Sequence, residues 1–430
     1  MTQRETRVRI ALVGGSQLLQ KLVGFLVIAI MTRYFSREAL GEYFLAVAVG
    51  TIAAQATELG TGRHLIRSVA RDKAGALEQL SQVLSLRLPL MLAAFVAINA
   101  VCLVVRPSLS PTLLVVSLYL LLQDLQFTYS ALFVGLERYR IRVAVDVTAQ
   151  LVLAGLTLLL ARRGGALHSL LWAHVVAYAD VLAITTLLVT ARYGRLRLRL
   201  TRARAWGLAR QSLPIFGVTL LDALHARADT ILLGFLRPLP DVAAYAAAYR
   251  LLEVSRMGIR PVALIFFPIC VAVAARHDWA ELRRLFGRLT RTSLVLGAAA
   301  ALVVIAGADL IVPLVFGPRY PDTVPLVRIL FLSTPMLFTG LLAVALIHTL
   351  HLERQAIRAG IWCVVANVAL NAVAIPLWGP AGAAAVSLAT QALWTVWLAR
   401  VVLTHLDESV PAGADAASEA LEEARMESVE

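Results

Sequence analysis

Charge is scarce in this sequence, and cysteine is scarcer still. Only 16% of the 430 residues are Asp, Glu, Lys or Arg, whereas 59% are hydrophobic and the mean hydropathy is +0.77. A soluble protein of this length carries far more charge, so that class is excluded. The three cysteines, Cys102, Cys270 and Cys363, lack the spacing of metal ligands and are expected to pack among apolar side chains.

Recognisable catalytic motifs are also missing. The sequence contains no phosphate-binding glycine loop, no metal-ligand cluster and no nucleophile triad, so no cofactor is expected. The largest polar segment on the predicted outer side, Gly317–Thr323, is short, whereas a membrane-embedded glycan polymerase or ligase needs a sizeable outer loop with catalytic groups. The sequence therefore does not favour an enzyme.

The sequence contains many long apolar stretches. Each has about 18–25 residues, enough to cross roughly 30 Å of hydrocarbon, which predicts an all-α polytopic membrane protein. The first stretch has Lys21 near its middle and no small-residue cleavage site, so it is expected to remain as a spanning helix. Twelve spans are predicted: 9–32, 40–61, 83–105, 111–135, 143–161, 167–191, 213–236, 241–268, 292–316, 324–349, 355–377 and 380–404.

The distribution of basic residues predicts the topology. With a cytoplasmic N-terminus, 26 Lys and Arg fall on inner segments, Arg87 among them, and eight on outer segments. The positive-inside rule then places both termini in the cytoplasm. The basic residues that give the net charge of +13 are interpreted as topology signals that also contact anionic lipid head groups. Nucleic acid is not expected as a partner.

The chain divides into two related halves around the basic loop 192–212. Tyr34-Phe35 resembles Phe235-Leu236 at an offset of 201 residues, and Leu40–Ala46 resembles Val242–Ala248 at an offset of 202. The glycine-containing turns before the sixth and twelfth spans are also alike. Because each half has six spans, the halves are expected to be parallel repeats with a cavity between them. The predicted domains are an N-lobe, 1–199, a C-lobe, 200–405, and an acidic, disordered cytoplasmic tail, 406–430.

The eighth predicted span carries an unusual group of charges. Arg250, Glu253, Arg256 and Arg260 fall on one face at 100° per residue. An arginine at the bilayer centre costs at least about 2.5–3.5 kcal/mol, so this face cannot be turned to lipid. A cationic cavity in a membrane indicates an anionic cargo, although a closed ion network around Glu253 that only stabilises packing is the alternative.

Several segments together resemble a known family. These segments are Gly41-Glu42-Tyr43, Ala226–Gly234, Ala244–Glu253, and Asn367, Asn371, Ile375-Pro376 and Gly379–Ala384. Through them the chain is similar, over about residues 8–405, to bacterial Wzx-type polysaccharide-biosynthesis flippases. These flippases are part of the multidrug/oligosaccharidyl-lipid/polysaccharide (MOP) exporter superfamily, which also contains the MATE transporters.

The resemblance implies two six-helix lobes that alternate access to a central cavity. The implied cargo is an undecaprenyl-pyrophosphate-linked oligosaccharide, moved from the inner to the outer leaflet of the bacterial cytoplasmic membrane. Other polysaccharide-assembly proteins are candidate partners. A peptidoglycan-precursor flippase and a cation-coupled multidrug antiporter remain alternatives. The former usually has fourteen spans, and the latter typically has an acid early in the first helix, where this chain has Lys21.

The candidate site residues were selected by their depth in the predicted spans and by the chemistry of their side chains. Arginine suits pyrophosphate because its planar fork binds phosphate oxygens in pairs and keeps its charge. The predicted cargo-binding residues are Gln17, Gln20, Lys21, Arg227, Arg250, Arg256 and Arg260. Asp222, Asp229 and Glu253 are predicted to assist release, and Arg63 and Arg67 to meet the head group at the cytoplasmic side. Structural roles remain open for the glutamines, for Arg227 and Asp229, and for Arg63 and Arg67, which also serve as topology signals.

Overall fold

The computed structural model describes the backbone of residues 3–198 and 202–427. Side chains are described in these ranges except at 3–14, 16–18, 202–206, 209, 211–215, 218, 260–261, 264–265, 268 and 409–427. The predicted lobe boundary at 199/200 lies outside the described residues, and so do the side chains of most of the predicted tail, 406–430. Over the described ranges the chain is helical and forms no strand.

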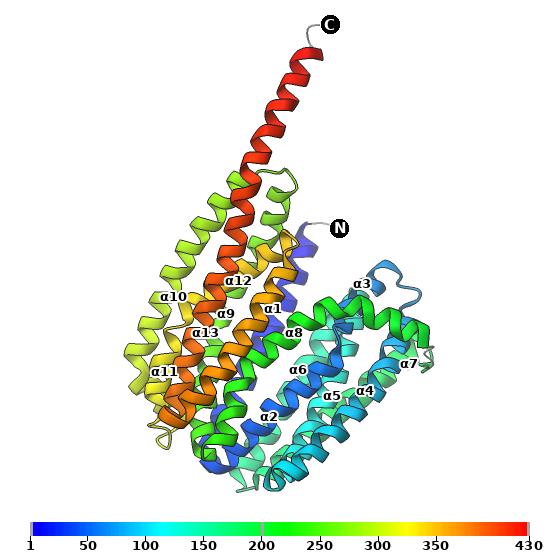
Figure 1. Cartoon of the computed structure of the whole chain (residues 1–430). Coiled ribbons are helices and arrows are strands. Elements are labelled where there is room, and N and C mark those ends of the chain that lie inside the picture. Colours follow the sequence, from blue (N-terminus) through cyan, green and yellow to red (C-terminus); the bar gives the residue numbers. More distant parts are fainter. Residues whose placement is uncertain (1–2, 199–201, 428–430) are drawn as a thin grey trace. The chain divides into compact units, whose positions relative to one another are not determined.

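The predicted spans fall on helices, and Figure 1 shows these helices along the chain. Ten of the twelve spans lie within a single helix, whereas 40–61 reaches into α3 and 324–349 covers α11 and α12. A backbone in hydrocarbon favours helices because it has to satisfy its hydrogen bonds within the segment. The helices are α1 (Gln3–Tyr34), α2 (Arg37–Glu58), α3 (Thr61–Arg71), α4 (Ala76–Val105), the 3-10 turn η1 (Pro107–Leu109), α5 (Ser110–Gly135), α6 (Tyr139–Arg162), α7 (Leu167–Tyr193), α8 (Arg202–Leu236), α9 (Leu239–Ala274), α10 (Trp279–Phe316), α11 (Thr323–Phe331), α12 (Thr334–Thr349) and α13 (Glu353–Glu427).

Two of the predicted spans meet inside α13. Gly379 interrupts this helix with φ 58° and ψ −139°, a conformation that favours glycine, and it separates the predicted spans 355–377 and 380–404. The predicted span 324–349 is broken as well, since α11 and α12 meet at a bend of 44°. By length and composition, seven described helices qualify as membrane spans, or eight if the bent pair is one span. The full number of twelve and the cytoplasmic termini stay predictions.

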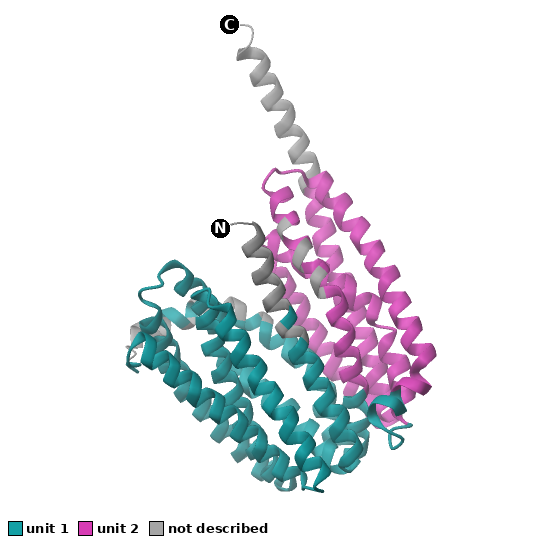
Figure 2. Ribbon diagram, turned by 180° about the vertical axis from the view of Figure 1, so that it is seen from behind, with its two compact units in different colours: residues 1–247, 312–321 teal, residues 248–311, 322–430 magenta. Residues whose placement is uncertain are grey.

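The helices gather into two compact units, which Figure 2 colours separately. Unit 1 comprises residues 1–247 and 312–321, and unit 2 comprises residues 248–311 and 322–430. In unit 1, α2 packs against α4, α5 and α8, while α5 also packs against α7. A close approach occurs at Gly41, where a Cβ atom would lie 1.9 Å from the carbonyl oxygen of Leu239. Only glycine lets these two backbones approach so closely.

The surface of unit 1 is apolar where a lipid-facing helix is expected. On α4, the side chains of Leu92, Val96 and Val104 are 64%, 58% and 81% exposed. Large exposed apolar side chains in such numbers are unfavourable in water but match the hydrocarbon of a bilayer. The predicted membrane location of this helix therefore agrees with its side-chain exposure.

Unit 2 contains its own core, built from α9, α10, α12 and α13. Phe266, Phe286, Leu346 and Leu398 are among its buried side chains. The buried cysteines Cys270 of this core and Cys102 and Cys363 elsewhere form no disulfide, in agreement with the prediction of apolar packing.

Candidate functional site

The charged residues of α9 in unit 2 lie inside an apolar helix. Arg250 donates from Nη1 to Oε2 of Glu253 at 2.9 Å, and the two side chains are 24% and 25% exposed. Arg256 is half-buried, and its Nη2 lies 3.5 Å from the Tyr249 hydroxyl oxygen. The side chain of Arg260 lies outside the described residues. The structure thus brings Arg250, Glu253 and Arg256 together on one helix, as predicted from their spacing.

A buried stripe of α9 lies beside the charged face. Leu252, Ile259, Phe266 and Cys270 are buried, and their spacing of seven, seven and four residues keeps them on one stripe. Phe266 and Cys270 of this stripe belong to the core of unit 2, and helix geometry puts the charged residues about a third of a turn away from the stripe. Hydrophobic packing of this adjacent stripe therefore helps to set the direction in which the charged face points.

The candidates in α1 belong to unit 1. Lys21 is exposed and Gln20 is half-buried, whereas the side chain of Gln17 lies outside the described residues. The predicted role of Lys21 in cargo binding stays a prediction.

The candidates in α8 differ strongly in their exposure. Asp229 is buried, and one of its carboxylate oxygens accepts a hydrogen bond of 2.7 Å from the hydroxyl of Tyr245 in α9. Asp222 is exposed and Arg227 is half-buried. Asp229 therefore ties α8 to the start of α9 within unit 1, which agrees with the structural alternative for this residue.

Arg63 and Arg67 lie on a separate short helix that was not foreseen. The predicted second span ran to residue 61, but α2 ends at Glu58 and the amphipathic α3 follows. Leu65 and Val69 bury one side of α3, while Arg63, Arg67 and Arg71 are exposed on the other. Sequence spacing contained this signal, since the apolar and the basic residues both recur every four positions.

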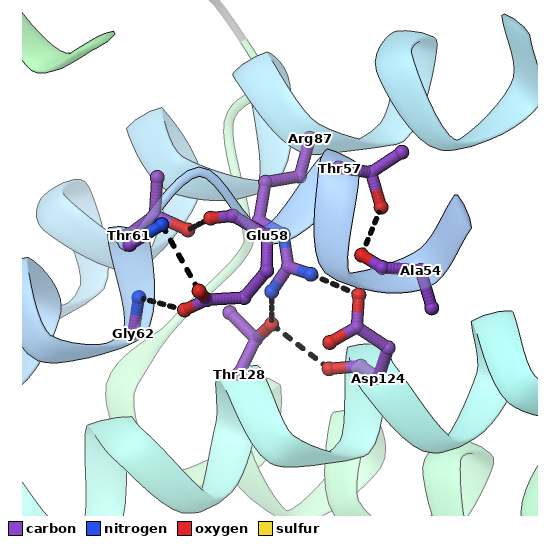
Figure 3. A network of polar contacts seen from close by, with 9 residues as sticks. Ala54, Thr57, Glu58, Thr61, Gly62, Arg87, Asp124 and Thr128 are labelled. Atoms are coloured by element: carbon purple, nitrogen blue, oxygen red, sulfur yellow. Dashed lines mark hydrogen bonds and ion pairs between the residues drawn. The ribbon is translucent and has the colours of Figure 1, made fainter. Parts of the chain in front are cut away.

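Arg87 is where the sequence interpretation was wrong. It was counted among the inner charges that set topology, but its side chain is only 1% exposed within α4. Its guanidinium bonds the carboxylate of Asp124 and the hydroxyl of Thr128, both from α5 (Figure 3). The sequence interpretation missed this buried ion pair, because two charges 37 positions apart show no local pattern.

The break between α2 and α3 lies near this ion pair, since Glu58 interacts electrostatically with Asp124. Leu59 and Gly60 both adopt left-handed conformations, with φ of 49° and 71°. The Glu58 carboxylate accepts the backbone N–H groups of Gly60 at 3.0 Å and of Gly62 at 2.9 Å. A carboxylate at the N-terminus of a helix is favoured by the helix dipole, so Glu58 holds the start of α3 in place.

An aromatic residue is buried in the loop after α10, in the part that belongs to unit 1. Tyr320 is 1% exposed, and the guanidinium carbon of Arg37 lies 5.6 Å from its ring centroid. Burial raises the pKa of the Tyr320 phenol to about 12, an effect that the nearby Arg37 charge partly opposes. The phenol is therefore neutral at physiological pH. Among the described residues, no group of His, Cys, Asp and Glu side chains could hold a metal ion.

Comparison with solved structures identifies the fold. The fold is similar to the lipid II flippase MurJ in an inward closed conformation, with 12% identity, a TM-score of 0.73 and coverage of 93% of this chain and 90% of that chain. It is also similar to an inward-facing multidrug resistance MATE family transporter of the MOP superfamily, with 16% identity, a TM-score of 0.72 and coverage of 92% and 96%. The fold is thus that of the MOP superfamily, as predicted.

The family follows from the sequence itself. Residues 9–273 match the family described as polysaccharide biosynthesis protein, and the chain belongs to this family. This match confirms the predicted family. A third solved structure, a MOP superfamily transporter from Pyrococcus furiosus with reverse polarity of its binding pocket, has 12% identity and a TM-score of 0.65 over 93% of this chain and 96% of that chain. No curated protein sequence matches this chain.

Proposed function

We propose that this protein is a flippase for a lipid-linked oligosaccharide. It moves a polyprenyl-pyrophosphate carrier and its sugars from the inner to the outer leaflet of the bacterial cytoplasmic membrane. The observation that carries this proposal is the half-buried group Arg250, Glu253 and Arg256 on α9, in a chain that belongs to a polysaccharide-biosynthesis family. A pyrophosphate and its sugars cannot cross hydrocarbon unaided, so a cationic site within the membrane matches the need of this cargo.

The contacts within the group support an exchange of anions. Glu253 occupies one side of the Arg250 guanidinium, and a phosphate group of the cargo would compete for the same N–H donors. After translocation, Glu253 would recover Arg250 and help to expel the phosphate. Such competition keeps binding moderate, since each charge-assisted hydrogen bond contributes about 1.5–3 kcal/mol and several would trap the cargo.

The other predicted residues have the following roles in this proposal. Lys21 and Arg260 add positive charge for the pyrophosphate, and Gln17, Gln20 and Arg227 contact the cargo. Asp222 and Asp229 assist release. Arg63 and Arg67 on α3 meet the head group at the cytoplasmic side before translocation.

A peptidoglycan-precursor flippase is the second candidate, and the similarity of the fold to MurJ favours it. Both candidates require a cationic site for a pyrophosphate, and they differ in the sugars that are carried. A cation-coupled drug antiporter is less compatible with arginines on the charged face of α9. A glycan polymerase or ligase requires catalytic groups on an outer loop, which were not recognised in the sequence.

The test is accumulation of lipid-linked oligosaccharide in cells that lack this protein, resolved by leaflet. We expect repeat units to be trapped on the cytoplasmic face and to be released by the wild type but not by Arg256→Ala. Arg256→Lys, which keeps the charge but loses the planar fork, should restore transport in part. Arg328→Ala is the matched control, because Arg328 also pairs with an acid in unit 2, Asp309, but is 45% exposed.

The outcomes separate the candidates. Normal outer-leaflet units together with a failure of peptidoglycan-precursor export would favour the second candidate. Normal outer-leaflet units with an altered sensitivity to cationic drugs would favour the antiporter. Full transport by Arg256→Glu, at wild-type expression, would refute the role of Arg256 in cargo binding.

A further inference from the structure

The helix α7 carries an isolated carboxylate halfway along its length. Asp180 lies thirteen residues after Leu167, the start of α7, and thirteen residues before Tyr193, its end. At 1.5 Å per residue, it is about 20 Å from both ends of a helix that is long and apolar enough to cross a membrane. Asp180 is therefore near the middle of a hydrocarbon layer about 30 Å thick.

The side of α7 that carries Asp180 is otherwise apolar and exposed. The side chain of Asp180 is exposed, and Val176, Ile184 and Leu187 are 52%, 61% and 68% exposed. At 100° per residue these four residues fall within about 80° of the helix circumference, so they form one stripe. We call residues 176, 180, 184 and 187 the outer stripe of α7.

A different side of α7 holds the helix in unit 1. His174, Tyr178 and Thr185 are buried, and α7 packs against α5 and α6. These three side chains lie roughly 120–160° around the helix from Asp180. The outer stripe is therefore left to face lipid or another membrane protein.

Asp180 lacks the surroundings that ionisable side chains in a membrane usually have. Such side chains almost always face the protein interior or a water-filled cavity and pair with an opposite charge. Asp180 lies on an apolar exposed stripe, and no described residue forms a hydrogen bond or an ion pair with it. A cation supplied by another molecule would complete the missing pair.

We propose that the outer stripe of α7 is a docking site for a membrane-spanning helix of another protein, and that this helix carries a Lys or Arg near mid-depth. The cation pairs with Asp180, while apolar side chains of the partner pack on the rest of the stripe. Because Asp180 is already out of water, pairing adds attraction without a further loss of hydration on its side. The pair is little screened in hydrocarbon, so it selects a partner by charge and by depth.

Small residues beside Asp180 allow a second helix to approach closely. Ala173 is half-buried and Ala183 is exposed, and both lie within about 60° of Asp180 around the helix. Small side chains at such positions let two membrane helices pack backbone to backbone. The shape of the stripe thus suits a helix, and its charge suits a basic one.

A second copy of this chain is a poorer occupant of the outer stripe. Two copies related by a two-fold axis would contribute the same stripe from both sides. Two Asp180 carboxylates would then meet at mid-depth, and like charges repel strongly where the dielectric constant is low. Charge complementarity therefore favours a different protein. The docking site does not depend on the proposed function, because no predicted cargo-binding residue lies on α7.

The test uses the full-length protein in vesicles of phosphatidylethanolamine and phosphatidylglycerol, with a designed peptide as the probe. The peptide is a helix of about 24 leucines and alanines with one central arginine, which is long enough to span the bilayer. Matched peptides carry leucine or aspartate at the centre. A fluorescent donor on Ala191→Cys, an exposed position near the end of α7, reports energy transfer to an acceptor on the peptide. The three native cysteines are replaced by alanine first, since they are buried and unpaired.

We expect the arginine peptide to bind the wild type with a dissociation constant at least about tenfold below that of the leucine peptide. Asp180→Leu should remove this preference, and it should fold because it takes an unpaired charge off an exposed position. Asp180→Lys should reverse the preference in favour of the aspartate peptide. Val176→Leu is the matched control, since it changes the same stripe without changing its charge and should keep the preference.

Three results would overturn the proposal. Equal binding of the arginine and leucine peptides by the wild type would show that Asp180 recruits no cation. A preference that survives Asp180→Leu would place the docking site elsewhere. Energy transfer between donor-labelled and acceptor-labelled copies without any peptide, lost in Asp180→Leu, would make a second copy the occupant.

A charge exchange in cells tests the natural partner. A photo-crosslinking amino acid at position 184, one turn from Asp180, should capture a membrane helix in the wild type and not in Asp180→Leu. The captured helix has to carry a Lys or Arg near mid-depth, and its replacement by Asp should abolish capture until Asp180→Lys restores it. A captured helix with no basic residue in its span, or an exchange that fails to restore capture at normal expression, would refute the proposal.

Discussion

The substitution Arg87→Met tests whether the ion pair inside unit 1 behaves as a buried pair. Methionine keeps most of the length and apolar volume of the arginine stem but removes the guanidinium. The Asp124 carboxylate, which is 13% exposed, then has no positive partner. Loss of one partner from a buried pair costs about 3–5 kcal/mol, which changes the unfolding equilibrium by about two to four orders of magnitude.

A surface pair in the same unit provides the comparison. Lys73 bonds Glu137 at 2.7 Å, but the two side chains are 51% and 38% exposed. Water and salt screen such a pair, so Lys73→Met should change the free energy of unfolding by less than about 1 kcal/mol. The double variant Arg87→Met with Asp124→Leu should unfold no more easily than the wild type, since it buries no charge.

The measurement is unfolding of the purified protein in mixed micelles, followed by tryptophan fluorescence as the denaturing detergent is increased. We expect a large decrease in the free energy of unfolding for Arg87→Met and little change for Lys73→Met. In the double variant the free energy of unfolding should return to about the wild-type value. Equal costs for Arg87→Met and Lys73→Met would refute this expectation, because Arg87 would then be solvated in spite of its low exposure.

Two further substitutions test the packing of unit 1 in the same assay. Gly41→Ala places a methyl group 1.9 Å from the Leu239 carbonyl oxygen and should cost about 1–3 kcal/mol, whereas Gly155→Ala meets no atom within 4 Å and should stabilise its helix by up to about 1 kcal/mol. Equal effects at both glycines would contradict the close approach. Tyr245→Phe removes the hydrogen bond to the buried Asp229 and should cost about 1–3 kcal/mol. A neutral result there would mean that Asp229 finds another donor.

The sequence allowed most of the helical architecture to be predicted. The apolar spans recur as helices because membrane insertion depends on local composition, which a single window of about 20 residues reports. The positions of Arg250, Glu253 and Arg256 on one face were also predictable, since the geometry of a helix is periodic. The family was also predictable from the sequence, because its motifs are local.

The contacts of particular residues were harder to predict from the sequence. The helix α3 was merged with the second predicted span, because the break after Glu58 depends on a side-chain carboxylate that holds the next helix start. Arg87 was assigned to the membrane surface because only its position near the start of an apolar stretch was visible. Its partner Asp124 comes from a neighbouring helix, and packing of α4 against α5 decides that contact.

The sequence by itself determined that this is a helical membrane protein of a polysaccharide-biosynthesis family with arginines inside a span. These properties follow from composition and from spacing along one helix, and they need no knowledge of neighbours. The tertiary structure decided which charges are paired, which are buried and which remain accessible. Pairing depends on side chains that meet across helices, and no periodicity along a single helix encodes such a meeting.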